Sequence, residues 1–194
     1  MDKFTLIETP IKELFIIGTE VFTDSRGFFV ESYNLRDFAK IELNMNFVQD
    51  NHSKSKKGVL RGLHFQLKHP QGKLVRVIKG RVFDVAVDLR PDSKTFTKWF
   101  GVELNEENGL QFYIPPFFAH GFLALENDTY FSYKCTDYYY PDDEFGFIWD
   151  DSLINIKWPV DKVDEVIVSE KDHNLGSFES IKEMIMKGMR WRKQ

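Results

Sequence analysis

The chain has 194 residues, 42% of them hydrophobic and 15% aromatic, which is enough for one domain with a sizeable core. This composition excludes a disordered chain, and the formal net charge of −4 provides no global attraction for nucleic acid. An anionic ligand would therefore need a local cluster of Arg and Lys side chains. Cys135 is the single cysteine, which excludes an intrachain disulfide and is compatible with a reducing cytosol. The N-terminus is too charged for a signal peptide, and no apolar run is long enough to span a membrane. We therefore expect a cytoplasmic protein that does not contact a membrane.

Short strand patterns dominate the chain from residue 11 to about residue 160. The first two strands are expected over 11–17 and 20–22, and DSRG at 24–27 follows as a tight turn. Asn34, with Asp37 three positions later, predicts the N-cap of a short helix. The remaining strands, separated by Pro and Gly residues, are expected over 59–66, 73–79, 81–89, 97–104, 111–114, 120–125 and 131–136. Many short strands without strand–helix alternation predict an all-β fold of the sandwich or jelly-roll type.

The run VFDVAVDLR has the clearest alternation in the chain. Its two faces consist of Phe83, Val85, Val87 and Leu89 on one side and of Asp84, Ala86 and Asp88 on the other. This period of two is typical of a β-strand.

Near the C-terminus, the pattern changes from strand to helix. Ser180 and Glu183 predict a capping box that opens a helix over about 180–189. The apolar stripe of this helix, which we expect to dock on the domain, consists of Ile181, Met184, Ile185 and Met189. The basic end of the chain is expected to be solvated. Because no repeat or linker interrupts the pattern, residues 1–194 are expected to form one domain.

Ionisable side chains interrupt three of the apolar strand patterns, namely GVLRGLHFQ at 58–66, AHGF at 119–122 and FSYKC at 131–135. Such a residue is either a satisfied polar residue of the core or part of a site. Taken singly, His64 could be a hydrogen-bonded histidine of the core, and Tyr133 an ordinary aromatic residue of a strand. Arg61 and Lys73 taken singly are typical of surface charges. Because one fold must accommodate them together, they predict a barrel whose interior carries out chemistry.

These residue types suit proton transfer. His64 is the natural base near neutral pH, and the phenol of Tyr133 can give a proton to a carbanion on the far side of a substrate. Lys73 can place a cation beside a developing enolate oxygen. The planar guanidinium groups of Arg26 and Arg61 fit a diphosphate.

No motif for a dinucleotide, a P-loop, a zinc protease or a serine hydrolase occurs in the chain. A metal-binding jelly roll typically has two histidines one residue apart, whereas His64 is followed by Phe65 and Gln66. Neither a metal nor a nucleotide cofactor is therefore expected.

Six segments, in order, closely resemble the dTDP-4-dehydrorhamnose 3,5-epimerase family. They are RGFFVESYN (26–34), FVQDNHSKSKKGVLRGLHFQ (47–66), PQGKLVRVIKGRVFDVAVDLR (70–90), IPPFFAHGFLAL (114–125), YKCTDYYYP (133–141) and SEKD (169–172). The resemblance extends from about Phe4 to about His173. It implies a cupin-type jelly roll, a homodimer without metal or nucleotide cofactor, and epimerisation of dTDP-4-dehydro-6-deoxy-D-glucose at C3 and C5 on the way to dTDP-L-rhamnose.

The resemblance also implies roles for individual residues. His64 resembles the family's base, Asp172 the carboxylate that orients it, and Tyr133 the proton donor on the opposite face. Lys73 and His120 resemble the residues around the sugar ketone. The implied contacts to the rest of the substrate are Arg26, Glu31, Gln49, Asp50, Asn51 and Arg61 for the nucleotide and diphosphate, Tyr139 for stacking on thymine, and Glu144 and Lys171 as outer contacts.

Two alternatives remain open on the sequence alone. One is an enzyme that epimerises a single carbon, or a keto-isomerase of a related sugar nucleotide, because the fold does not determine the reaction. The other is a sugar-nucleotide-binding cupin without activity, but the presence of His64, Tyr133 and Lys73 favours an enzyme. For the homodimer, the segment 11–22 is the expected addition to a neighbour's sheet, which would bring Arg26 or Glu31 near the partner's pocket.

Overall fold

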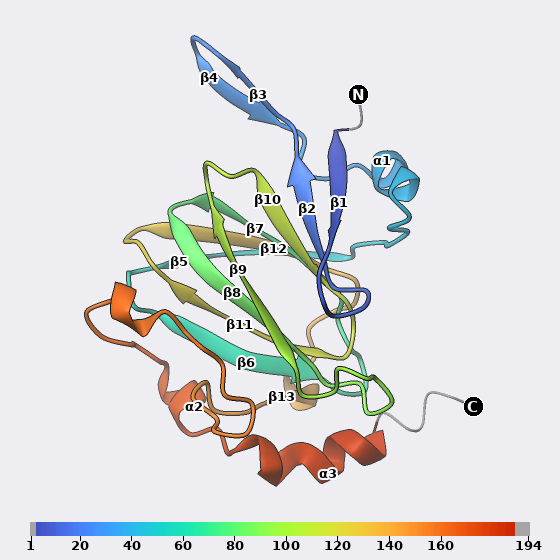
Figure 1. The fold of residues 1–194 in the computed structure, drawn as a ribbon, viewed down its shortest axis with the longest axis vertical. Coiled ribbons are helices and arrows are strands. Elements are labelled where there is room, and N and C mark those ends of the chain that lie inside the picture. Colours follow the sequence, from blue (N-terminus) through green and yellow to red (C-terminus); the bar gives the residue numbers. More distant parts are fainter. Residues whose placement is uncertain (1–2, 189–194) are drawn as a thin grey trace.

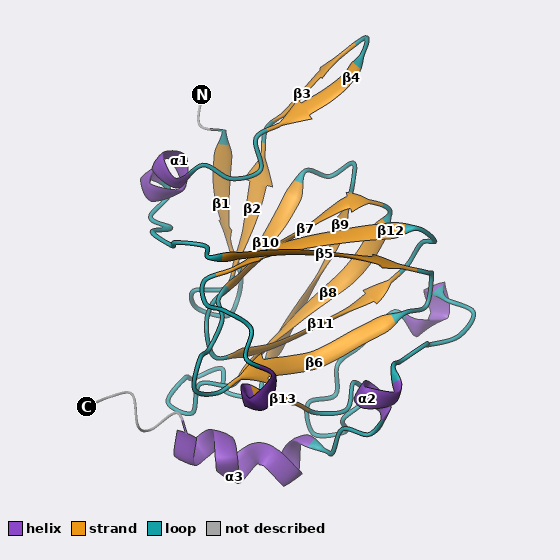
Figure 2. Cartoon of the chain, turned by 180° about the vertical axis from the view of Figure 1, so that it is seen from behind, coloured by secondary structure: helices purple, strands orange, loops and turns teal. Residues whose placement is uncertain are grey.

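The structure, a computed structural model, describes residues 3–188, and its strands form two antiparallel sheets that face each other (Figure 1). The six-stranded sheet has the order β1 (Phe4–Glu8), β2 (Phe15–Thr19), β10 (Leu110–Ile114), β7 (Lys73–Lys79), β12 (Thr129–Cys135) and β5 (Gln49–Ser55). The five-stranded sheet has the order β13 (Glu144–Gly146), β6 (Leu60–Gln66), β11 (Phe118–Ala124), β8 (Arg81–Asp88) and β9 (Trp99–Asn105). The remaining elements are the hairpin of β3 (Val21–Asp24) and β4 (Gly27–Val30), the helices α1 (Leu35–Lys40), α2 (Glu170–His173) and α3 (Phe178–Gly188), and the short 3₁₀ helices η1 (Pro141–Asp143) and η2 (Val160–Lys162). This is the all-β jelly roll that the strand pattern predicts, with the helices outside the sheets (Figure 2).

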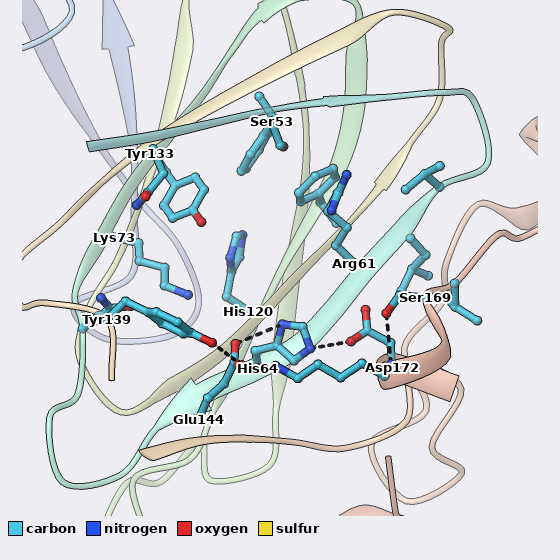
Figure 3. A pocket seen from close by; sticks show the side chains of 18 of the residues that line it. Ser53, Arg61, His64, Lys73, His120, Tyr133, Tyr139, Glu144, Ser169 and Asp172 are labelled. Carbon is cyan, nitrogen blue, oxygen red and sulfur yellow. Dashed lines mark hydrogen bonds and ion pairs between the residues drawn. The ribbon is translucent and has the colours of Figure 1, made fainter. Parts of the chain in front are cut away.

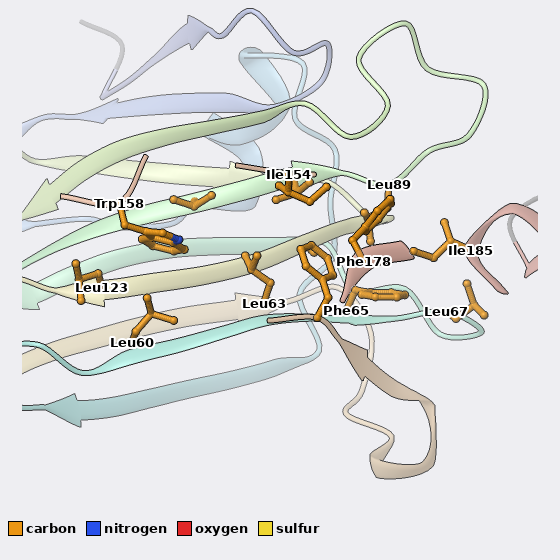
Figure 4. Close-up of a cluster of buried hydrophobic side chains, with 14 of the residues drawn as sticks. Leu60, Leu63, Phe65, Leu67, Leu89, Leu123, Ile154, Trp158, Phe178 and Ile185 are labelled. Atoms are coloured by element: carbon orange, nitrogen blue, oxygen red, sulfur yellow. The ribbon is translucent and has the colours of Figure 1, made fainter. Parts of the chain in front are cut away.

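The five-stranded sheet is buried on both faces. Val82 and Ala86 of β8 pack between the two sheets with residues such as Phe112 and Phe131, whereas Val85 and Val87 pack on the opposite side. The second cluster lies between this sheet and the C-terminal part of the chain, and Figure 4 shows Leu63, Phe65 and Leu89 beside Phe178 and Ile185. The predicted alternation of β8 is therefore confirmed, and both of its faces belong to the interior.

The C-terminal helix docks as expected but begins elsewhere. α3 begins at Phe178, where the backbone N–H donates to the buried carboxylate of Asp151 (2.8 Å), while the Ser180 hydroxyl donates to the carbonyl of Ser177. The predicted capping box at Ser180 is therefore wrong, because a distant carboxylate and a fully buried Phe178 determine the start of the helix. Ile185 is buried in the predicted docking face, and Met189 and the basic end lie outside the described residues.

The N-terminal strands differ from the prediction in two ways. Residues 11–14 form a turn in which the Leu14 N–H donates to the Ile11 carbonyl, so the predicted strand over 11–17 is wrong in its first half. Furthermore, β2 already pairs with both β1 and β10, and a strand paired on both sides cannot add to a neighbour's sheet. The edge strands of this sheet are β1 and β5, neither of which the sequence pattern indicated. The predicted helix after Asn34 is confirmed. The side chain of Asn34 caps it by accepting hydrogen bonds from the backbone N–H groups of Arg36 and Asp37.

The β3–β4 hairpin projects from the body of the molecule (Figure 1). Its side chains are exposed, with Phe28 at 59% and Phe29 at 67% of their full accessibility. An isolated two-stranded hairpin is marginally stable in water, and exposed neighbouring aromatic rings commonly mark an interaction surface. The hairpin is therefore a region that a second molecule would stabilise.

Candidate active site

A pocket of about 630 Å³ opens between the two sheets. Its walls come from β5, β7 and β12 of the six-stranded sheet, from β6 and β11 of the five-stranded sheet, and from the segments around residues 139–144 and 167–172. Figure 3 shows polar and charged side chains from both sheets pointing into this space. Of the residues that the sequence singles out, the pocket brings together Gln49, Asn51, Arg61, His64, Lys73, His120, Tyr133, Tyr139, Glu144, Lys171 and Asp172.

His64 on β6 is paired with Asp172 on α2. Its Nε2 atom lies 2.7 Å from Oδ1 of Asp172, and the other carboxylate oxygen accepts a hydrogen bond from the backbone N–H of Gly62 (3.3 Å). Burial raises the pKa of Asp172, but the hydrogen bonds from His64 and Gly62 outweigh it, and the pKa is lowered overall. Because an ionised carboxylate only accepts hydrogen bonds, the hydrogen between the two groups belongs to Nε2 of His64, which leaves Nδ1 on the side away from Asp172.

The position of Asp172 depends on how the preceding segment lies against the start of β6. The N–H of Ile167 donates to the Gly58 carbonyl (2.8 Å), and the N–H of Leu60 donates to the Ile167 carbonyl (2.9 Å). Gly58 has a φ of +85°, and a Cβ atom there would overlap the carbonyl oxygen of Glu165. Only glycine therefore lets the segment approach β6 this closely.

Glu144 on β13 lies at the other nitrogen of the base. One of its oxygens is 3.9 Å from Nδ1 of His64, and the other accepts hydrogen bonds from the Tyr139 hydroxyl (2.9 Å) and from Lys171. Burial raises the pKa of Glu144, but the hydrogen bond from Lys171 and the attraction to His64 outweigh it and keep the carboxyl group ionised. Tyr139 is thereby held beside the base at the edge of the pocket.

The neighbouring strand β11 carries a second histidine–carboxylate pair, next to His64 on the same sheet. His120 on β11 is 8% exposed, and its Nε2 atom lies 3.0 Å from both oxygens of the fully buried Asp84. Burial raises the pKa of Asp84, although the attraction to His120 and Lys73 opposes the shift. Asp84 was recognised in the sequence only as part of an alternating strand, because its partner on β11 becomes visible only with the strand order.

Lys73 and Tyr133 enter the pocket from the facing six-stranded sheet. The ammonium group of Lys73 on β7 lies 5.9 Å from the centre of the Tyr133 ring on β12. Burial lowers the pKa of Lys73, while attraction to Cys135, Glu144 and Asp84 opposes the shift. Burial raises the pKa of Tyr133, so that its phenol keeps the proton at neutral pH.

Three of the predicted substrate contacts lie outside this pocket. Arg26 is at the tip of the hairpin, 87% exposed in its side chain and paired with Asp24. Glu31 pairs with Lys3 at 3.2 Å, and neither residue lines the pocket. Asp50 points to the outer face of β5, where it pairs with Lys134. Within one chain, these three side chains do not contribute to the site.

Two glutamines hold the backbone that carries Tyr139. Gln66, 5% exposed, donates to the carbonyls of His69 and Tyr138 and accepts from the N–H of Tyr140 (2.8 Å). Gln49 accepts from the N–H of Tyr139 itself (2.8 Å). Gln66 was missed in the sequence, where it appeared only as the last residue of the strand bearing His64.

No group of three or more His, Cys, Asp or Glu side chains within residues 3–188 has the arrangement of a metal site. In the same range, no helix is long and apolar enough to cross a membrane.

Comparisons with known proteins agree with the resemblance. Residues 8–180 match the family model described as dTDP-4-dehydrorhamnose 3,5-epimerase. The dTDP-4-dehydrorhamnose 3,5-epimerase of Methanothermobacter thermautotrophicus is 53% identical over 174 residues, which cover 90% of this chain and 94% of that protein. The crystal structure of the dTDP-6-deoxy-D-glucose-3,5-epimerase of Legionella pneumophila in complex with dTDP-4-keto-L-rhamnose has a TM-score of 0.89 and 46% identity, covering 94% of this chain and 96% of that one. Because the family model and both relatives span nearly the whole chain, the chain belongs to the dTDP-4-dehydrorhamnose 3,5-epimerase family.

Proposed function

We propose that the chain converts dTDP-4-dehydro-6-deoxy-D-glucose to dTDP-4-dehydro-L-rhamnose by epimerisation at C3 and C5, a step of dTDP-L-rhamnose biosynthesis. The observation that supports this most directly is the arrangement of a base and an acid on opposite sheets. His64 enters the pocket from β6, and Tyr133 enters it from β12 (Figure 3). Inversion of a carbon centre needs this arrangement, because the proton must leave one face and return to the other.

The C4 ketone acidifies the hydrogens on both neighbouring carbons. Nδ1 of His64 accepts the proton, and the electrons of the broken C–H bond form an enolate whose charge lies on the C4 oxygen. The O–H of Tyr133 then protonates the same carbon from the other face. Exchange of protons with solvent restores both side chains, and the cycle repeats at the second carbon. No net oxidation or reduction occurs, so the chemistry requires no redox cofactor.

The second histidine pair and Lys73 would stabilise the enolate. The ammonium group of Lys73 and the ring of His120 both line the side of the pocket where Asp84 lies. A positive charge in a largely desolvated site stabilises a developing oxyanion more strongly than it would in water. Asp84 balances part of this charge and orients the His120 ring.

Proton NMR of the sugar nucleotide with enzyme in D₂O tests the proposal. A 3,5-epimerase places deuterium at both C3 and C5 and yields the L-sugar. Incorporation at one carbon alone would indicate a single-carbon epimerase. Binding of dTDP without any exchange would indicate a binding protein and would contradict the proposed activity.

We further propose that the enzyme works in the cytoplasm as a homodimer with composite sites. The exposed hairpin carries Arg26 between exposed aromatic side chains, and Glu31 follows directly after β4. Placed against a second molecule, the hairpin would cover its apolar surface and carry Arg26 to the partner's pocket. The expected mass by sedimentation equilibrium at micromolar concentration is twice the 22.9 kDa of the monomer. A fully active monomer would contradict both the dimer and the shared site.

A further inference from the structure

Ser53 carries a buried hydroxyl group without a protein partner. Among the residues that the structure describes, its Oγ atom is the buried side-chain oxygen or nitrogen that makes no hydrogen bond. Buried hydroxyl groups are nearly always paired, because leaving one unpaired costs its full desolvation. Ser53 lines the pocket (Figure 3), so a molecule that enters the pocket can supply the missing acceptor.

The strand that carries Ser53 is built for ligand contact along one face. Gln49, Asn51 and Ser53 of β5 line the pocket, while Asp50 points away from it. Asn51 is paired with Tyr133 of the neighbouring strand, and Ser53 is paired with Phe131. Ser53 therefore lies about 7 Å along the strand from the level of the proposed proton donor.

Arg61 places a cationic group in the same pocket, next to the strand that carries Ser53. Its Nε atom donates to the hydroxyl of Ser55 (3.3 Å), the next residue on the pocket face of β5. Within residues 3–188, the Arg61 guanidinium forms no ion pair with a carboxylate, whereas the carboxylates of Glu144, Asp172 and Asp84 already have partners. The Arg61 end of the pocket thus presents donors that lack an anionic acceptor.

We propose that Ser53 is a substrate-binding residue whose hydroxyl donates a hydrogen bond to an oxygen of the diphosphate held beside Arg61. A guanidinium group and a hydroxyl donor together match an anion with several acceptor oxygens. The inference rests on the proposed function only in that the ligand is a nucleoside diphosphate sugar. It assigns to Ser53 a contact that the sequence patterns did not indicate.

Ser53→Ala tests the assignment, with Ser132→Ala as the matched control. Ser132 lies on β12, the strand paired with β5, and its side chain does not line the pocket. Calorimetry should show a loss of dTDP affinity of about tenfold to a hundredfold for Ser53→Ala, the range for a hydrogen bond to a charged group. Thymidine affinity, measured by ligand-observed NMR, should stay within about twofold, since thymidine lacks the diphosphate.

The melting temperature of the free protein separates binding from folding. Because the hydroxyl has no protein partner, Ser53→Ala should leave this temperature unchanged or raise it. Unchanged dTDP affinity would overturn the assignment, as would equal losses for thymidine and dTDP. A raised KM for the sugar nucleotide at unchanged dTDP affinity would place the hydroxyl on the sugar and would overturn it as well. Wild-type protein that binds dTDP without exchanging substrate protons would contradict the proposed function alone.

Discussion

The pocket contains two histidine–aspartate pairs that use the same chemical groups in different surroundings. His64 and His120 are direct neighbours in the pairing of β6 with β11. Asp172 reaches His64 from a short helix more than a hundred residues away, whereas Asp84 reaches His120 from the adjacent strand. The first pair borders the pocket opening between the sheets, and the second is almost entirely buried.

The surroundings push the two carboxyl groups in opposite directions. Asp172 accepts hydrogen bonds from Gly62 as well as His64, and its pKa is lowered although burial opposes this. Asp84 has His120 as its hydrogen-bond partner within the described residues, and burial raises its pKa. Burial and the number of hydrogen-bond donors therefore distinguish the pair proposed to orient the base from the pair proposed to hold charge beside the substrate.

The largest difference between the two pairs should appear when each histidine is replaced. His64→Asn is expected to lower kcat by about 10²–10⁴-fold, the usual contribution of a general base, with dTDP affinity retained. His120→Asn should cost less, because no proton passes through its ring in the proposed reaction. Steady-state kinetics with calorimetry for dTDP would check both. Turnover of His64→Asn within threefold of the wild type would contradict its role.

Replacing the acid should separate exchange from epimerisation. Tyr133→Phe removes the donor on the far face, while His64 can still remove a proton and return it on its own side. Product formation is expected to fall by about 10²-fold or more, and deuterium incorporation should fall less. NMR in D₂O measures both quantities in one sample. A strictly proportional loss would mean that Tyr133 is not a separate donor.

Lys73 should determine the pH above which activity is lost. Because burial lowers the pKa of Lys73 and raises that of Tyr133, Lys73 should lose its proton first as the pH rises. The alkaline limb of kcat/KM should therefore lie below pH 10.4, about the ordinary value for lysine. Lys73→Arg keeps its charge and should move that limb to higher pH, whereas Lys134→Arg on the outer surface should not. Identical limbs for Lys73→Arg and wild type would refute this assignment.

The smallest effects are expected on stability, where replacing the two aspartates should change the free energy of unfolding in different directions. A carboxyl group with a lowered pKa stabilises the fold above its unfolded pKa, and this contribution disappears as the pH falls through the folded pKa. Asp172→Asn should thus lower the free energy of unfolding at pH 7 by about 1 kcal/mol, with a smaller loss near pH 3. Asp84 has a raised pKa, so its charged form costs stability at neutral pH, and Asp84→Asn should be neutral or stabilising there. Urea denaturation at pH 7 and near pH 3 would measure the free energy of unfolding of both variants. A larger loss for Asp84→Asn than for Asp172→Asn at pH 7 would contradict the prediction.

The residues proposed to react could be singled out in the sequence because ionisable side chains interrupt apolar strands. His64 and Tyr133 occur within otherwise apolar strands, where a polar group is conspicuous, and Lys73 follows a Gly-containing turn at the start of its strand. The strand β5 has no such pattern, since one face carries polar residues toward the pocket and the other carries polar residues toward solvent. It was therefore missed as a strand, and Ser53 was missed with it.

Other features depend on contacts between distant segments. The start of α3 is determined by Asp151, and no local signal competes with a buried carboxylate at a helix N-terminus. Arg26 and Glu31 were assigned only through the family resemblance, and their positions on and beside a projecting hairpin become meaningful only with a second chain. The local sequence pattern thus indicated the residues proposed to react. The contacts that position the segments around them could be seen only in the tertiary structure.

Gly58 shows how far the rate can depend on a residue remote from the reaction. It does not itself line the pocket, but its missing side chain leaves room for the Glu165 carbonyl. Even a methyl group at this position would lift the segment that leads into α2 and carry Asp172 away from His64. The sheets would stay folded, but the proposed base would lose the contact that orients it. A single added methyl group is therefore expected to slow the enzyme without unfolding it.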